Sequence, residues 1–192
     1  MTPPRSARTS SDAPAPAGDG APGDEAVTSY RVTVEKDDLV FCAGHFITYD
    51  DGQVCESLHG HNYRVSVTLW GGVNDDAYVF DFVALKDTMR ELVGELDHRM
   101  LLPRDNPELE LERGDDGISV AYGERKYLFP ERDVVVLPVP NTTAEMLARH
   151  LLDRLAERLD EAGAGNLREA EIEVEESFGQ AGWARRSLGA GS

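Results

Sequence analysis

Three histidines occur at spacings that suit the binding of one metal ion. His59 and His61 lie in a segment, 59–69, where polar and apolar residues alternate, so a strand would project both imidazoles to the same, apolar face. His45 lies in a second alternating segment that we expect to be adjacent. Three imidazoles with one open position form the ligand set of a catalytic zinc site. The alternative is that each histidine is a hydrogen-bonded core residue.

Two cysteines differ in their surroundings. Cys55 lies four residues before His59, on a loop that we expect to end beside the metal. A nearby cation lowers the pKa of a thiol, and the thiolate can act as a base or a nucleophile. A buried, inert cysteine is the alternative. Cys42 alternates with apolar residues and has no charged neighbour, so we expect it to pack in the core.

Asp97 and His98 are a carboxylate and an imidazole in direct succession. Such a pair can orient and deliver a proton, but consecutive side chains do not face each other on a regular helix. We therefore expect the pair at an irregular helix end. The alternative is a histidine that is simply favoured by the negative end of the helix dipole.

Glu176 is a carboxylate at an apolar position. In the alternating segment 171–176, Ile172, Val174 and Glu176 share one face, and the other glutamates share the opposite, wet face. A buried carboxylate needs partners, which a cation or a ligand rich in N–H groups would supply. The alternative is a glutamate at the strand end that curls towards water.

The strands that must position these residues are predicted from period-two alternation. They cover 30–47, 59–69 and 171–176, with a last short strand near Trp183. The inward-facing parity reverses around Lys36–Asp38, which predicts a β-bulge there. Strands therefore occupy both ends of the domain.

Two helices are predicted between these strands. Asp81 can act as the N-cap of the first, and Thr142–Glu145 has the pattern of a capping box that opens the second, which Gly163 and Gly165 end. Apolar residues form one stripe along the first helix: Leu85, Met89, Leu92 and Leu96. This order favours an α+β fold, in which a four-stranded antiparallel sheet carries both helices on one face.

Composition and charge limit the classes of protein to which this chain can belong. The 192 residues contain 19 Lys and Arg against 36 Asp and Glu, a net charge of −17, which argues against binding of nucleic acid or an anionic membrane surface. No apolar run is long enough to span a bilayer, and the N-terminus lacks the apolar region of a signal peptide. We expect a cytoplasmic protein.

The domain organisation follows from local composition. Residues 1–28 consist mostly of Pro, Ala, Gly, Ser and Thr and predict a disordered tail. Residues 29–192 are long enough for a single domain with its own core. Within it, 104–136 is predicted to be an insertion at the domain edge, containing a hairpin of 118–122 and 126–129 around Gly123-Glu124.

Six motifs in sequence order resemble those of the 6-pyruvoyl-tetrahydropterin synthase and 6-carboxytetrahydropterin synthase family. The resemblance covers about residues 30–185, apart from the insertion. The motifs are Phe41-Cys42-Ala43-Gly44-His45, Cys55-x-x-x-His59-Gly60-His61-Asn62-Tyr63, Asp81-Phe82 with Leu85-Lys86, Leu96-Asp97-His98, Thr142-Thr143-Ala144-Glu145 and Val174-x-Glu176-Ser177.

The resemblance implies a tunnelling fold, in which the sheets of three subunits close into a barrel and two trimers stack into a homohexamer. It implies pockets between subunits. The resemblance assigns the family's roles to the matching residues of this sequence: one group binds Zn²⁺, a second performs proton transfer and a third holds the pterin. These are His45, His59 and His61 for zinc; Cys55 as the base with Asp97 and His98 as the relay; and Glu176 as the ring anchor beside Thr142 and Thr143.

The implied substrate is 7,8-dihydroneopterin triphosphate, from which triphosphate is eliminated. The product is 6-carboxy-tetrahydropterin, on the route to queuosine, or 6-pyruvoyl-tetrahydropterin, on the route to tetrahydrobiopterin. Glu56 departs from the pattern, because some relatives carry a glutamate instead of the cysteine and release 6-hydroxymethyl-dihydropterin for folate synthesis. The alternative for Glu56 is a loop charge that faces water. The insertion, with Arg125 and Lys126, is a second departure that either borders the triphosphate or has no role at the site. A non-catalytic pterin- or zinc-binding module is the alternative from another class.

Overall fold

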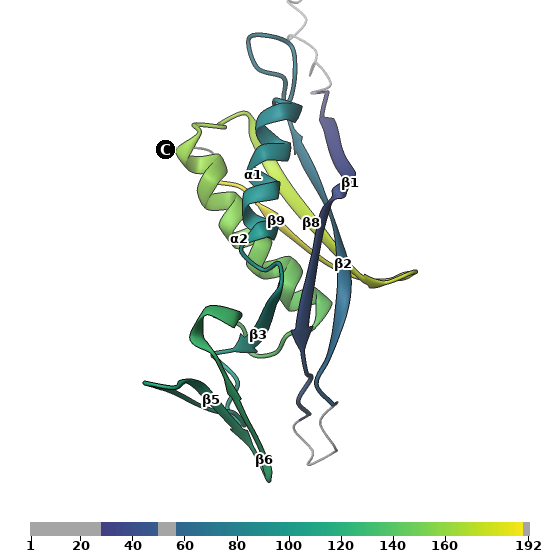
Figure 1. The fold of residues 1–192 in the computed structure, drawn as a ribbon. Helices are drawn as coiled ribbons and strands as arrows, with labels where there is room; N and C mark the ends of the chain where they lie inside the picture. Colours follow the sequence, from purple (N-terminus) through teal and green to yellow (C-terminus); the bar gives the residue numbers. More distant parts are fainter. Residues whose placement is uncertain (1–27, 50–56, 190–192) are drawn as a thin grey trace, which may run out of the picture.

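The computed structural model describes residues 28–49 and 57–189. These residues form one large sheet, one small sheet and two α-helices (Figure 1). In chain order the elements are β1 (Tyr30–His45), β2 (His59–Gly71), α1 (Phe82–Gly94), β3 (Arg99–Pro103), β4 (Glu110–Gly114), β5 (Gly117–Tyr122), β6 (Arg125–Phe129), a 3₁₀ turn (Glu131–Asp133), β7 (Val134–Leu137), α2 (Ala144–Glu161), β8 (Leu167–Ser177) and β9 (Gln180–Ser187).

The main sheet has the strand order β7-β3-β1-β2-β8-β9. The pairs β1–β2, β2–β8 and β8–β9 are antiparallel, which confirms the four predicted strands. The expectation of a four-stranded, wholly antiparallel sheet is nevertheless wrong, because β3 and β7 extend the sheet beyond β1 in parallel. The end of the predicted insertion therefore lies in the main sheet, as β7.

The predicted bulge in β1 is confirmed. Pairing with β2 shifts register between Glu35 and Val40, and after the shift Phe41 and His45 face the core. The side chain of Cys42 is exposed. The expectation that Cys42 packs in the core is thus wrong, because the alternation that buries Phe41 turns the next side chain to the opposite face of the strand.

Both helices cover one face of the main sheet, as predicted (Figure 1). The carboxylate of Asp81 accepts hydrogen bonds from the N–H groups of Val83 and Ala84 at 2.6 and 3.4 Å, which confirms it as the N-cap of α1. Gly163, at φ 67°, follows the end of α2. The predicted apolar stripe of α1 is buried, and each such side chain contributes about 1.5 to 3 kcal/mol relative to exposure.

The start of α2 differs from the prediction. Its N-cap is Thr143, and no side chain caps it, so the capping box is not formed. The hydroxyl of Thr142 instead donates to the carbonyl of Phe46, at 3.2 Å. Gly182 on β9 allows this end of the helix to approach the sheet, because a Cβ at Gly182 would lie 2.5 Å from the backbone nitrogen of Glu145.

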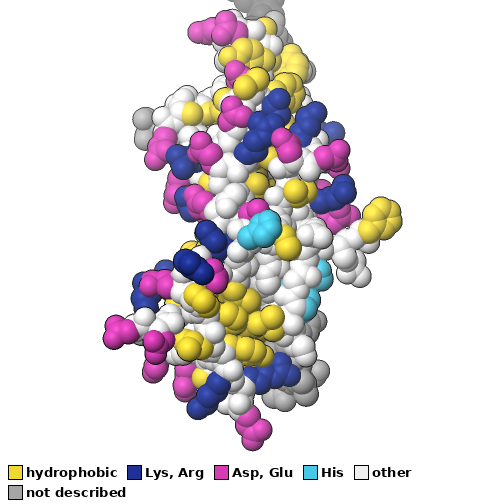
Figure 2. Space-filling model, viewed as in Figure 1, with side chains coloured by type: hydrophobic (Ala, Val, Ile, Leu, Met, Phe, Trp, Pro, Cys, Tyr) yellow, Lys and Arg dark blue, Asp and Glu magenta, His cyan; other side chains and the backbone are white. Residues whose placement is uncertain are grey.

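The small sheet has the order β4-β5-β6, which confirms the predicted hairpin as β5 and β6. It packs over the segment that follows β1. Phe46 stacks on Tyr127 with ring centroids 5.6 Å apart, and the hydroxyl of Tyr122 donates to the carbonyl of Tyr49 at 3.3 Å. Hydrophobic side chains gather over this part of the surface, whereas charged side chains of both signs are scattered over the rest of the same view, with further hydrophobic side chains among them (Figure 2).

The face of the main sheet that the helices leave uncovered is polar. Thr33 and Thr68 share a hydrogen bond of 3.0 Å across β1 and β2, and the guanidinium of Arg185 lies 4.2 Å from the ring centroid of Trp70. Within the described ranges, no helix is long and apolar enough to cross a membrane.

Candidate metal centre

Four side chains meet at one end of the main sheet. One ligand atom from each of His45, His59, His61 and Glu176 lies within 4.8 Å of all the others. The Nε2 atoms of His45 and His59 are 3.2 Å apart, and Nε2 of His61 lies 2.8 Å from Oε1 of Glu176. The three predicted metal ligands and the predicted pterin anchor therefore lie in a single cluster.

Strand pairing brings these four residues together. His45 and His59 are direct partners in the β1–β2 register, and His61 follows two residues later on the same face of β2. Glu176 stands at the end of β8, on the other side of β2, and its side chain reaches the same cluster. The parity that predicted Glu176 to point away from the wet face is confirmed.

Two backbone carbonyls fix the orientation of two imidazole rings. Nδ1 of His45 lies 3.0 Å from the carbonyl of Thr142, and Nδ1 of His59 lies 2.7 Å from the carbonyl of Ser57. A carbonyl can only accept, so each Nδ1 carries the proton and each neutral ring keeps its lone pair on Nε2. Burial lowers the pKa of His45, which favours the neutral form that binds metal.

The residues present fit a zinc ion. With both Nδ1 atoms protonated, two lone pairs face each other across the 3.2 Å between His45 and His59, an arrangement that a cation between them would relieve. Nε2 of His61 is buried, and its 2.8 Å contact with Oε1 of Glu176 does not have hydrogen-bond geometry. Three imidazole nitrogens and one carboxylate oxygen suit zinc better than magnesium or calcium, which prefer oxygen ligands.

Asp97 and His98 lie on the turn between α1 and β3, which confirms the predicted irregular helix end. His98 has a positive φ of 55°, and its Nδ1 lies 2.8 Å from Oδ2 of Asp97. The backbone N–H of Cys42 donates to Oδ1 of Asp97 at 2.8 Å, and this bond lowers the pKa of the carboxyl. The side chain of His98 is 80% exposed and does not join the four-residue cluster.

The remaining predicted site residues fall into two groups. Cys55 and its neighbour Glu56 lie outside the described residues, as do residues 1–27 of the predicted N-terminal tail. Thr142 is fully buried beside His45, and Thr143 precedes the first turn of α2. The hydroxyl of Tyr63, which was not among the predicted site groups, lies 3.3 Å from Nε2 of His45. The alternation that places His59 and His61 on one face extends to Tyr63 and could have identified it.

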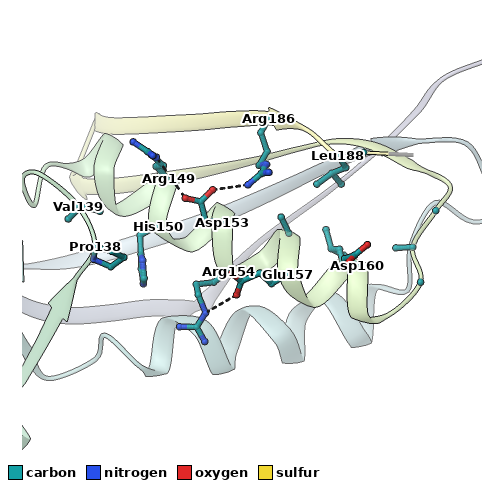
Figure 3. Close-up of a pocket in the computed structure, with 16 residues that line it drawn as sticks. Pro138, Val139, Arg149, His150, Asp153, Arg154, Glu157, Asp160, Arg186 and Leu188 are labelled. Carbon is teal, nitrogen blue, oxygen red and sulfur yellow. Dashed lines mark hydrogen bonds and ion pairs between the residues drawn. The ribbon is translucent and has the colours of Figure 1, made fainter. Parts of the chain in front are cut away.

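A large hollow lined by described residues lies away from the histidine cluster. It measures about 1050 Å³ and runs along the outer side of α2 (Figure 3). Its arginines are already paired with carboxylates: Arg149 and Arg186 with Asp153, and Arg154 with Glu157. Since these charges neutralise one another, the histidine cluster is the stronger candidate for chemistry.

Comparison with protein families and sequences identifies relatives. The family model described as 6-pyruvoyl tetrahydropterin synthase matches residues 33–187. A protein of Methanocaldococcus jannaschii, provisionally named 6-carboxy-5,6,7,8-tetrahydropterin synthase, is 36% identical over 135 residues, which are 70% of this chain and 83% of the relative. The 6-carboxy-5,6,7,8-tetrahydropterin synthase of Aquifex aeolicus is 34% identical over 111 residues, 57% of this chain and 61% of that protein.

Solved structures resemble the fold at full length. The 6-pyruvoyltetrahydropterin synthase of Plasmodium vivax superposes with a TM-score of 0.79 at 30% identity, over 84% of this chain and 100% of that one. The Plasmodium falciparum protein of the same name gives a TM-score of 0.79 at 33% identity, with the same coverage. In a further P. vivax structure alanine replaces a glutamate that is described as a catalytic residue.

Proposed function

This chain belongs to the 6-pyruvoyl tetrahydropterin synthase family, and we propose that it is a zinc-dependent lyase that eliminates triphosphate from 7,8-dihydroneopterin triphosphate. The observation that carries this proposal is the convergence of three histidines and a glutamate, with ligand atoms within 4.8 Å of one another, on the sheet of a family member. The buried Nε2 of His61, which faces Oε1 of Glu176 at 2.8 Å, and the fixed tautomers of His45 and His59 support the metal.

In this proposal one set of residues binds the metal and a second set transfers protons. His45, His59 and His61 hold zinc, which when bound supplies Lewis acidity to substrate oxygens. The Cys55 thiolate removes a proton from the substrate carbon. His98, oriented by its 2.8 Å contact with Asp97, returns a proton. The carboxylate of Asp97, whose pKa is lowered by the Cys42 amide, stays ionised and stabilises the imidazolium form of His98.

Glu176 is proposed to hold the pterin ring. A carboxylate can accept two hydrogen bonds from adjacent N–H groups of a pterin. Its oxygen lies 2.8 Å from Nε2 of His61, so an anchored ring would lie directly beside the metal. A fourth metal ligand is the competing role for the same carboxylate, since Glu176 offers one oxygen to the cluster.

The product is proposed to be 6-carboxy-tetrahydropterin, because the curated relatives quoted above carry that name. Formation of its one-carbon side chain releases the other two side-chain carbons as acetaldehyde, in addition to triphosphate. Two other products compete. The 6-pyruvoyl compound is the product named for the Plasmodium structures. The 6-hydroxymethyl compound competes because a glutamate is described as a catalytic residue in the P. vivax protein and this chain has Glu56 directly after Cys55.

We further propose that the pocket is shared between copies of the chain in a hexamer. The exposure of His98, 80%, supports a residue that acts on a pocket beyond its own cluster. Co-refolding of His59→Ala chains with His98→Ala chains tests the sharing. Mixed assemblies should regain turnover that neither variant has alone, because some pockets would contain both wild-type residues. Mixed assemblies that stay inactive would contradict a shared pocket.

The experiment that tests the activity is incubation of the zinc-loaded protein with 7,8-dihydroneopterin triphosphate, with analysis of the product by mass spectrometry. Release of triphosphate with a product mass of the carboxy compound is expected. A pyruvoyl or hydroxymethyl mass would reassign the product within the family. Bound substrate without any release would favour the non-catalytic pterin-binding module.

A further inference from the structure

The chain leaves the main sheet after His45, and the next residues are clamped to the segment that precedes α2. The hydroxyl of Thr142 donates to the carbonyl of Phe46 at 3.2 Å. The amide of Asn141 donates to the carbonyl of Thr48 at 2.9 Å and accepts from the N–H of Thr48 at 3.4 Å. Segments 46–48 and 140–142 are thus joined by three hydrogen bonds.

One buried amide, that of Asn106, bridges both segments. Its Nδ2 donates to Oγ1 of Thr48 at 2.7 Å and to the carbonyl of Pro140 at 2.6 Å. Its Oδ1 accepts from the N–H of Glu108 at 3.0 Å. Asn106 is 8% exposed and Thr48 is 7% exposed, so water competes little for these bonds.

The hydrogen bonds that join segments 46–48 and 140–142 matter because they position a hydrogen-bond partner of a candidate metal ligand. The carbonyl of Thr142, in the clamped segment, receives the Nδ1 proton of His45 at 3.0 Å. Such partners set the tautomer and the ring orientation of a metal-binding histidine. The register with β2 fixes the backbone of His45, and the placement of segment 140–142 sets the acceptor for the Nδ1 side of its ring.

We propose that Asn106 is a positioning residue for the metal centre, which sets the Thr142 carbonyl against His45 by bridging the two segments. The proposal rests on the proposed zinc function. It also gives a role to part of segment 104–136, since Asn106 lies at the start of that segment and reaches the outer shell of the cluster without contacting the metal ligands.

The test variant is Asn106→Asp, which keeps the shape of the side chain but replaces its two-hydrogen donor by an acceptor facing the Pro140 carbonyl. A matched control exists at the far end of β2. Nδ2 of Asn166 donates to the carbonyls of Gly72 and Val79, both at 2.8 Å, so Asn166→Asp replaces an amide donor by an acceptor that faces backbone carbonyls away from the histidines. Both variants should lower the unfolding temperature of the zinc-free protein.

The deciding measurement is zinc affinity, obtained by titrating zinc into each zinc-free protein against a competing chelator. Asn106→Asp should bind zinc about tenfold more weakly than wild type, the lower end of the usual effect of losing an outer-shell partner. Asn166→Asp should match wild type. Equal zinc affinity in all three proteins would overturn the inference while leaving the zinc function standing. Wild-type protein that binds no zinc would overturn both.

A second variant keeps the inference testable where Asn106→Asp does not fold. Thr48→Val removes the acceptor for one Asn106 bond and leaves the backbone bonds of Thr48 with Asn141 in place. Thr48→Ser retains the hydroxyl. The valine variant should weaken zinc binding several-fold and the serine variant should restore it. Valine and serine variants with the zinc affinity of wild type would overturn the inference.

Discussion

The metal cluster and the Asp97–His98 pair are built in opposite ways. The cluster draws ligand atoms from three strands to within 4.8 Å, and its central residue, His45, is completely buried. The pair is local, lies in one turn, and leaves the imidazole 80% exposed. One chain therefore brings the four candidate ligands together, whereas it leaves the Asp97–His98 pair open on the imidazole side.

The largest expected effect is on the cluster. His59→Ala removes one of three imidazoles and leaves the carbonyl of Ser57 without its partner. Zinc affinity should fall by more than about 100-fold, beyond the usual effect of losing an outer-shell group, and turnover should be lost with it. Metal analysis after dialysis checks this. Full zinc occupancy in the variant would remove His59 from the ligand set.

The next effect separates the two regions, because turnover should fall while zinc content stays the same. Asp97→Asn keeps the shape but removes the charge that orients His98, so turnover should fall by about 10²- to 10⁴-fold with zinc content unchanged. Asp105→Asn is the control, since Asp105 forms a surface ion pair with Arg104 at 2.8 Å. Zinc loss in Asp97→Asn would show that the two regions are coupled within the chain.

A smaller effect tests which region Glu176 serves. Glu176→Gln places a donor against a pterin donor, and neopterin binding should weaken by about 2 to 3 kcal/mol, with zinc content unchanged. Glu175→Gln should be nearly silent, because Glu175 uses an oxygen to accept from the N–H of Gly179 and an amide oxygen can still do so. Calorimetric titration with neopterin checks both. Loss of zinc in Glu176→Gln would make Glu176 a metal ligand instead.

The smallest effect is on stability in acid. The Cys42 amide lowers the pKa of Asp97 in the folded protein below its ordinary value of 3.8, so the carboxylate stabilises the fold above that value. This contribution is lost as pH falls through the folded pKa. Urea unfolding midpoints of wild type should therefore fall more steeply below about pH 4 than those of Asp97→Asn. Identical slopes would indicate that ionisation of Asp97 adds no stability to the fold.

Sequence patterns predicted the parts of the molecule that repeat with a clear period. Alternation placed His59 and His61 on one face and aimed Glu176 away from the wet glutamates, and the charges at 36–38 marked the bulge in β1. The roles assigned to these residues stay predictions. Cys42 was the exception, because the same alternation that buries Phe41 and Ala43 turns Cys42 to the open face of the strand.

Other parts escaped prediction because they lack a period. β3 and β7 are short parallel strands, and Met100, Leu101 and Leu102 are all buried, so no alternation marks them. The bridge from Asn106 to Thr48 joins single polar residues 58 positions apart in sequence. Thr142 was predicted to act in a capping box, but the hydroxyl is used by Phe46 and the carbonyl by His45.

The close approach at Gly182 has a consequence for mutational scanning. Every other amino acid carries a Cβ, which at this position would lie 2.5 Å from the backbone of α2, so the helix start would have to move. Thr142 would move with it, because it lies just before that helix. In a library selected for turnover, position 182 should tolerate glycine alone and score like an active-site residue, although its intolerance arises from backbone packing.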